Sequence, residues 1–258
     1  MYYPIQIPYI LSKPFAKSIS YKEEIIPRFQ DFVLCLWEMR PVSGEKAVVG
    51  DHIILADGCI DLVADFEKKE IGFSGMSKTV FDDEINTPHC HYGARFKPGA
   101  FHAITGIPAT EAMDRFLPIN SVDKHFDVDS FFALPFDEAK KSFKDFIGAL
   151  ILGKDINLTT LFDTFSDDIP ASVSEIYQRM RYSPKQCQRI FYRHFGLSPQ
   201  MSLCIIRFQK CLQILTSGTT SQTDIMDALN YYDQSHLIND FKKHIALTPL
   251  ELVRKYAS

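Results

Sequence analysis

The chain has 258 residues with 46% hydrophobic and 23% charged content, the composition of an ordinary globular protein long enough for two domains. It contains no run of eighteen apolar residues, so we expect no membrane-spanning helix. The first ten residues, MYYPIQIPYI, lack the basic and apolar regions of a secretory signal. The six cysteines include no CxxC pair and are expected to be reduced thiols, which favours the cytoplasm.

The net charge of −4 is unevenly divided along the chain. From Pro170 onward there are 11 Lys+Arg against 6 Asp+Glu, whereas residues 1–169 contain 17 against 26. Such an asymmetry suggests that the C-terminal part meets a polyanion and that the acidic part does not.

The first part of the chain is predicted to be rich in β-strands. In CIDLVADF (59–66), apolar residues alternate with Asp61 and Asp65 directly after an Asp-Gly pair, which is the pattern of a strand leaving a turn. The aromatic side chains of this N-terminal part of the chain either line a small-molecule pocket or form an ordinary hydrophobic core. Further strands are expected at 31–40, 47–55, 70–81 and 89–96, followed by short helices near 99–105 and 109–117.

The spacing of apolar residues becomes helical from Pro135 onward. Helices are predicted at 136–152 and 158–166, and they either join two domains and help the chain to dimerise or form a small core of their own. The predicted organisation is therefore a β-rich domain at 1–126, a short helical linker at 127–167 and an all-α domain at 168–258.

The C-terminal part contains an internal repeat. FYRHFGLSP at 191–199 recurs fifty residues later as FKKHIALTP at 241–249. In each copy a helix, a tight turn and a second helix with a polar, cationic outer face are predicted, which is the helix-turn-helix plan. A long helix within 198–218 joins the two units, and its run of about 16–18 helical residues spans about 25 Å. The fold class is thus α+β multidomain, with two helix-turn-helix units in its last part.

These features resemble the DNA-binding domain of AraC-type transcriptional regulators. The matching stretches are YSPKQCQRIFYRHFGLSP, RFQKCLQIL and YYDQSHLINDFKKHIALTPLELVR, within residues 170–256. The first part is similar to an uncharacterised N-terminal domain found on some of these regulators, through DGCIDLV and GARFKPGAF. The resemblance implies double-stranded DNA as partner, contact with RNA polymerase, a bacterial source, and a homodimer controlled by a small-molecule effector. It implies no cofactor and no enzymatic activity.

Carried over residue by residue, the family's base-reading positions fall on Lys185 and Arg189 in the first unit and on Ser235 and Asn239 in the second. Arginine can donate two hydrogen bonds to guanine, and Gln or Asn can pair with adenine in the same way. Lysine and arginine on the same face suit phosphate. The remaining candidates for DNA contact are Gln186, Gln188, Arg193, Gln234, His236, Lys242 and Lys243.

The chain departs from the family's pattern at several positions. Asn239 replaces a usual arginine, and Arg181 and Asn230 stand where the turn glycines are expected. Tyr177 and Gln222 also differ from the usual residue types. These departures suggest looser units and a second unit that reads little sequence.

A metal-binding or enzymatic N-terminal domain is the alternative interpretation. His89 and His91 flank Cys90 on a predicted strand and share one face, as in some metal sites on β-barrels. No acidic ligand follows at close spacing, so we favour two polar residues on a half-exposed strand. The sequence thus predicts a sequence-specific DNA-binding regulator and leaves its effector unknown.

Overall fold

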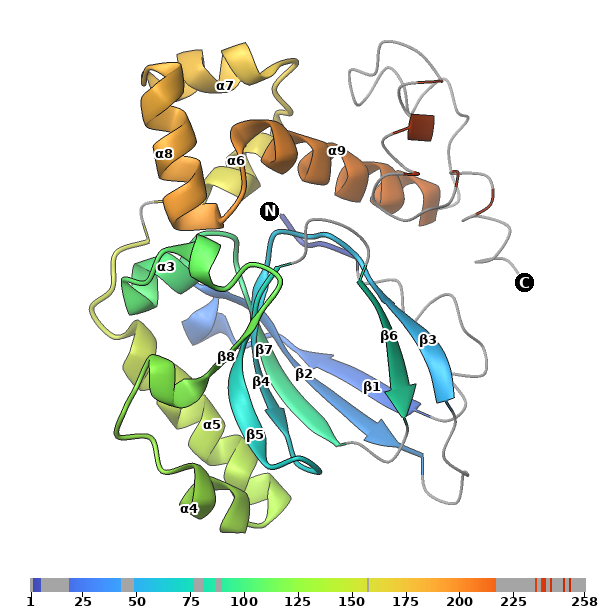
Figure 1. Cartoon of the computed structure of the whole chain (residues 1–258), viewed down its shortest axis with the longest axis vertical. Helices are drawn as coiled ribbons and strands as arrows, with labels where there is room; N and C mark the ends of the chain where they lie inside the picture. Colours follow the sequence, from blue (N-terminus) through green and yellow to red (C-terminus); the bar gives the residue numbers. More distant parts are fainter. Residues whose placement is uncertain are drawn as a thin grey trace.

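The computed structural model describes residues 2–5, 19–42, 49–76, 81–86, 90–156 and 158–216, and the single positions 235, 238, 239, 242, 248 and 251. Its N-terminal region is built on a six-stranded antiparallel sheet with the order β1-β2-β7-β4-β5-β8 (Figure 1). A separate pair, β3 and β6, lies beside it. The strands are β1 (Ile19–Glu24), β2 (Val33–Pro41), β3 (Val49–Ile54), β4 (Ile60–Asp65), β5 (Glu70–Ser74), β6 (Phe81–Asn86), β7 (His91–Phe96) and β8 (Phe116–Pro118).

Most of the described helices follow the strands in the sequence, but η1 lies between β1 and β2, and α3 and η2 lie between β7 and β8. The 3₁₀ turns are η1 (Pro27–Phe29), η2 (Ala109–Glu111) and η3 (Ile119–Ser121). The α-helices are α3 (Ala100–Thr105), α4 (Val128–Ala133), α5 (Phe136–Ile151), α6 (Leu161–Asp167), α7 (Val173–Met180), α8 (Pro184–Phe195) and α9 (Pro199–Thr216).

One face of the sheet forms the main hydrophobic core. The alternation in β4 buries Leu62 and Ala64 completely, and these side chains belong to the same cluster as Phe143 of α5. The helix α5 lies across this face, as Figure 1 shows, because its buried residues recur at helical spacing. Several of the aromatic side chains considered for a pocket are plain core: Phe73, Phe96 and Phe101 are at most 1% exposed.

The opposite face of the sheet is polar. Arg95 of β7 lies opposite Asp61 of β4, while Trp37 of β2 lies between Glu23 of β1 and Gly93 of β7. Glycine is required at position 93, since a Cβ atom there would lie 2.3 Å from the indole ring of Trp37. The sheet therefore turns its main apolar core toward α5, and the Arg95–Asp61 pair lies on the other face beside a small apolar cluster around Ile19 and Met39.

A second core joins the sheet to the C-terminal helices. Phe162 and Phe165 of α6 pack in one cluster with Phe195 of α8, together with Tyr2 and Cys59 from the N-terminal region. The ring centroids of Phe162 and Phe195 are 5.3 Å apart, as are those of Phe162 and Tyr2. Of the two helices predicted between the domains, α5 thus packs on the sheet and α6 packs with the C-terminal helices.

The order of elements confirms the predicted fold class in the described residues. The run predicted as one strand at 70–81 is two strands, β5 and β6, separated by residues 75–80. The helix predicted near 109–117 is wrong, because residues 109–111 form a 3₁₀ turn and 116–118 form the edge strand β8. The short strand β1 and the helix α4 were not predicted.

Candidate nucleic-acid interface

The first helix-turn-helix unit starts with a well-formed N-cap. The hydroxyl of Ser172 accepts a hydrogen bond from the backbone N–H of Glu175 and so caps the start of α7. It ends at Arg181, which takes the left-handed conformation with φ 57°. The turn therefore keeps the geometry that a glycine usually supplies, although a non-glycine residue in this region is strained.

The second helix of the unit, α8, is fixed at both ends. Ser183 and Gln186 form a capping box: the Ser183 hydroxyl accepts from the Gln186 N–H, and the Gln186 side-chain oxygen accepts from the Ser183 N–H at 3.0 Å. At the C-terminal end Gly196 has φ 69°, and a Cβ atom there would lie 3.0 Å from the carbonyl oxygen of Ala109. Glycine at 196 thus both ends the helix and lets it approach the N-terminal region.

The two faces of α8 differ in character. Cys187, Phe191 and Phe195 are fully buried, as the spacing predicts. The residues on the outer face are all exposed: Lys185, Gln186, Gln188, Arg189, Tyr192 and Arg193. The structure therefore brings the first-unit candidates together on one helix face. It also gives Gln186 a role in capping that the sequence did not indicate.

The cations on this face are not engaged elsewhere. Within the part of the chain that the structure describes, Lys185, Arg189 and Arg193 form no ion pair. Arg179 of α7, by contrast, is bound to Glu175 and Asp168, and the buried Arg207 donates to the carbonyl oxygens of Pro170 and Ala171. Cations with intramolecular partners are thus structural, and those on α8 remain available to a polyanion.

Tyr192 faces outward in the sequence pattern but is not among the predicted DNA contacts, and its side chain is 46% exposed on the outer face of α8. A large exposed ring on a cationic helix face is the signal that would have identified it as a candidate. Its phenol hydroxyl is a donor of the kind that binds phosphate oxygens.

The C-terminal end of α8 contacts the N-terminal region. The ring of His194 lies 4.4 Å from that of His102 on α3, in an edge-to-face arrangement. Burial, with His102 and Arg193 nearby, lowers the pKa of His194 to about 4. The helix proposed to meet DNA is therefore attached to the sheet domain by its far end.

The helix α9 occupies the predicted place between the two units. Its 18 residues correspond to about 27 Å at 1.5 Å per residue. In the second unit, Ser235, Asn239 and Lys242 are helical and exposed. The predicted positions Gln234, His236 and Lys243 lie outside the described residues, as do Gln222 and Asn230.

Comparison with known families assigns both parts of the chain. A family model described as a helix-turn-helix domain matches residues 176–255. Residues 176–255 are a helix-turn-helix domain of the AraC type. A second model, described as a domain of unknown function (DUF6597), matches residues 26–118 and agrees with the N-terminal resemblance. The AraC-type domain thus contains α8, and the match to the domain of unknown function covers strands β2 to β8.

Three solved structures of ToxT from Vibrio cholerae resemble the chain in outline. The first has 9% identity and a TM-score of 0.40, with 93% of this chain and 99% of that chain covered. The second has 9% identity and a TM-score of 0.43, covering 94% and 99%. The third, bound to (E)-4-(8-methylnaphthalen-1-yl)but-3-enoic acid, has 10% identity and a TM-score of 0.41, covering 93% and 100%. At these low TM-scores the likeness says nothing about the sites of this chain. No curated protein sequence gives a significant match.

Of the two histidines proposed as a metal pair, His91 lies among the described residues. His91 lies 3.2 Å from Asp65, whose carboxylate also accepts from the N–H groups of Glu67 and Lys68. His89 lies outside the described residues. Among the residues that are described, no group of three or more His, Cys, Asp or Glu side chains is arranged to hold a metal. In the same part of the chain, no helix is long and apolar enough to cross a bilayer.

Proposed function

We propose that the chain is a sequence-specific DNA-binding transcription regulator whose first unit reads base edges through the outer face of α8. The observation that carries this proposal is the group of exposed cations on α8, which form no ion pair with the described residues, within an AraC-type domain. Helix-turn-helix proteins place the N-terminal residues of the second helix in the major groove. Lys185, Gln188 and Arg189 occupy that part of α8.

The residues of this face have different roles in the proposal. Arg189 donates two hydrogen bonds to a guanine, and Gln188 lies beside it to read a neighbouring base. Lys185 and Arg193 lie on either side of these two residues, and Arg193 lies close to the phosphate backbone of the DNA. In the second unit, Ser235 and Asn239 face the bases and Lys242 binds phosphate, with Gln234, His236 and Lys243 as their neighbours in sequence.

The wider assignments are also proposals. The sheet domain would bind a small-molecule effector, and the chain would act as a homodimer with RNA polymerase in a bacterial cytoplasm, as the AraC resemblance suggests. The packing of α5 on the sheet and of α6 on the C-terminal helices supports a domain division within the predicted linker at 127–167.

The reading role of Arg189 can be tested on the full-length chain. Its preferred duplex is first obtained by selection from random DNA. Arg189→Ala is then expected to cost about 1–3 kcal/mol on that duplex and to relax the preference at one base pair. Lys242→Ala is expected to weaken selected and random duplexes by similar factors.

A charge-matched control separates contact from general electrostatics. Lys141→Ala removes one exposed cation from α5 and is expected to leave both affinities nearly unchanged. If Arg189→Ala and Lys141→Ala behave alike, α8 does not read DNA and the proposal is wrong.

A further inference from the structure

The polar face of the sheet holds a buried arginine with an unusual environment. The Arg95 side chain is 8% exposed, and its guanidinium lies 3.6 Å from Glu23, 3.6 Å from Asp61 and 3.9 Å from Asp57. All three distances exceed hydrogen-bond range. Among the described residues its Nε atom has no hydrogen-bond partner. Arg95 is thus a buried cation in loose ion pairs with three carboxylates, and its Nε–H is left without a hydrogen bond among the described residues.

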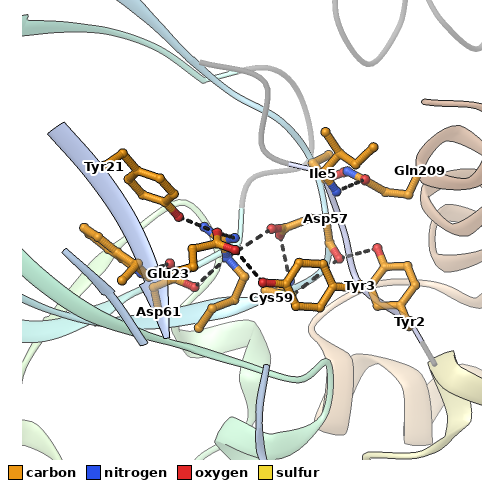
Figure 2. Close-up of polar contacts among 12 residues, drawn as sticks. Tyr2, Tyr3, Ile5, Tyr21, Glu23, Asp57, Cys59, Asp61 and Gln209 are labelled. Atoms are coloured by element: carbon orange, nitrogen blue, oxygen red, sulfur yellow. Dashed lines mark hydrogen bonds and ion pairs between the residues drawn. The ribbon is translucent and has the colours of Figure 1, made fainter. Parts of the chain in front are cut away.

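The carboxylates are held in place by other donors (Figure 2). The Trp37 Nε1–H donates to Asp61 at 2.9 Å, and the Cys59 N–H donates to Asp57 at 2.9 Å. Glu23 accepts from the Tyr21 hydroxyl at 2.6 Å and also from Tyr3. These donors keep the carboxylates at their positions, so the gap to Arg95 is built into the site.

A structural ion pair would have a different geometry. Arginine and carboxylate usually form direct, often bidentate hydrogen bonds when buried, because an unmade bond there is costly. The Nε–H of Arg95, which has no hydrogen-bond partner among the described residues, is therefore able to donate to an acceptor that is not part of the described chain, such as a ligand oxygen.

The charge of the cluster indicates which second chemical group a bound ligand would carry. Three carboxylates face one guanidinium, which leaves an excess of negative charge. Burial raises the pKa of Asp61 to about 6, although Arg95 opposes this shift. An ammonium group would offset the excess and favour the ionised carboxylate. Tyr21 and Trp37 stack with centroids 6.3 Å apart and provide the aromatic wall that ammonium groups favour.

We propose that Glu23, Asp61, Arg95, Tyr21 and Trp37 form a binding site for a small ligand that carries an ammonium group beside an oxygen acceptor. An amino acid and an amino alcohol share this chemistry. The ammonium group binds the carboxylates of Glu23 and Asp61, and the oxygen accepts from Arg95. Only the ligand's role as effector rests on the function proposed above, since its binding requires no DNA.

The site is tested by thermal unfolding of the full-length chain at constant ionic strength. Glycine and ethanolamine combine both groups, ethylamine has only the ammonium, and acetate has only the acceptor. We expect ethanolamine or glycine to raise the melting temperature most, ethylamine less and acetate not at all. The stronger of the first two identifies the source as amino alcohol or amino acid.

Variants separate binding from general solute effects, because glycine at high concentration stabilises proteins without a site. Glu23→Gln and Asp61→Asn are each expected to weaken the apparent affinity about tenfold or more. The matched control is Glu38→Gln, which removes a carboxylate bound to Arg40 and Lys140 on the opposite face of β2 and leaves the shift unchanged.

Equal shifts in the wild type and in both site variants would overturn the proposal and leave a purely structural ion-pair cluster. If ligand binding depends on Glu23 and Asp61 but does not change DNA affinity, the site stands and its role as effector site is wrong. If Arg189→Ala shows no DNA phenotype while the ligand still binds, the DNA-binding proposal alone fails.

Discussion

His194 stands where the helix proposed to read DNA meets the sheet domain. Its pKa is lowered to about 4 by burial and by the nearby His102 and Arg193, whereas a free histidine titrates near 6.5. Between these values the unfolded chain binds a proton that the folded chain does not. The free energy of unfolding therefore falls as the pH decreases from about 6.5 to about 4.

The variant His194→Gln is expected to lose part of this acid sensitivity, because its side chain takes up no proton in either state. The measurement is urea unfolding at several pH values between neutrality and about pH 4. His125→Gln, at an exposed position before α4, serves as control and is expected to keep the wild-type slope. An unchanged slope in His194→Gln would show that the ring contact with His102 does not exclude a proton.

At the scale of the element, α8 depends on its capping box. Ser183→Ala removes the acceptor for the Gln186 N–H and is expected to lower the free energy of unfolding by about 1 kcal/mol. Ser174→Ala, at an exposed position in the first turn of α7, is expected to change it little. Urea unfolding of both variants makes the comparison.

The capping box also leads to a prediction about the role of Gln186 in DNA recognition. Since the Gln186 side chain is bound to the Ser183 N–H, Gln186→Ala is expected to reduce stability while leaving base preference intact. A change of base preference in Gln186→Ala would show that Gln186 also contacts a base.

The helices α7, α8 and α9 show why much of this region was predictable from sequence. Ser172, Ser183, Pro184 and Gly196 are local signals, and each acts within one turn of its own position. The use of Gln186 as a cap and the left-handed conformation of Arg181 also follow from local geometry, but several residue types satisfy such positions. Local signals therefore located the helices better than they assigned roles to individual side chains.

The polar cluster and the second core were not predictable in the same way. Glu23, Asp61 and Arg95 come from three different strands and meet only through strand register. The edge strand β8 has three residues, too few for an alternating pattern, and it pairs with β5 more than forty residues earlier in the chain. Such contacts depend on tertiary packing, which periodicity along one segment does not report.

At the scale of the whole molecule, the N-terminal segment ties the two domains together. The Tyr2 N–H donates to Asp163 at 2.6 Å, and the Tyr2 hydroxyl donates to the carbonyl oxygen of Asp57 at 2.7 Å. The Gln209 side chain of α9 accepts from the Ile5 N–H and donates to the carbonyl oxygen of Ala56. Figure 2 shows the hydrogen bond that joins Ile5 to Gln209. A ligand that moves Glu23 would thus act on Tyr3, whose carbonyl oxygen accepts from Gln213 of α9.

The second core also determines at which residue the DNA-binding domain can be separated from the rest of the chain. A fragment starting at residue 168 loses Phe162 and Phe165, which are 1% and 2% exposed in the full chain. Removing one buried phenylalanine side chain costs about 3–5 kcal/mol, which is a large part of the stability of a small domain. The fragment 158–258 keeps Phe162 against Phe195 and keeps Phe165 in the same cluster, although it still lacks Tyr2 and Cys59.

We therefore expect the fragment 158–258 to unfold cooperatively at a clearly higher temperature than the fragment 168–258. Both are expected to unfold below the full chain. Circular dichroism on heating gives the midpoints, and binding to the selected duplex at increasing salt gives the DNA contribution, with an affinity that falls as counterions are released. As a control, Phe162→Ala in the longer fragment is expected to remove much of the difference, because it deletes the ring that contacts Phe195. Equal midpoints for the two fragments would show that α6 is not part of the folded DNA-binding domain and that the division predicted at residue 168 is correct.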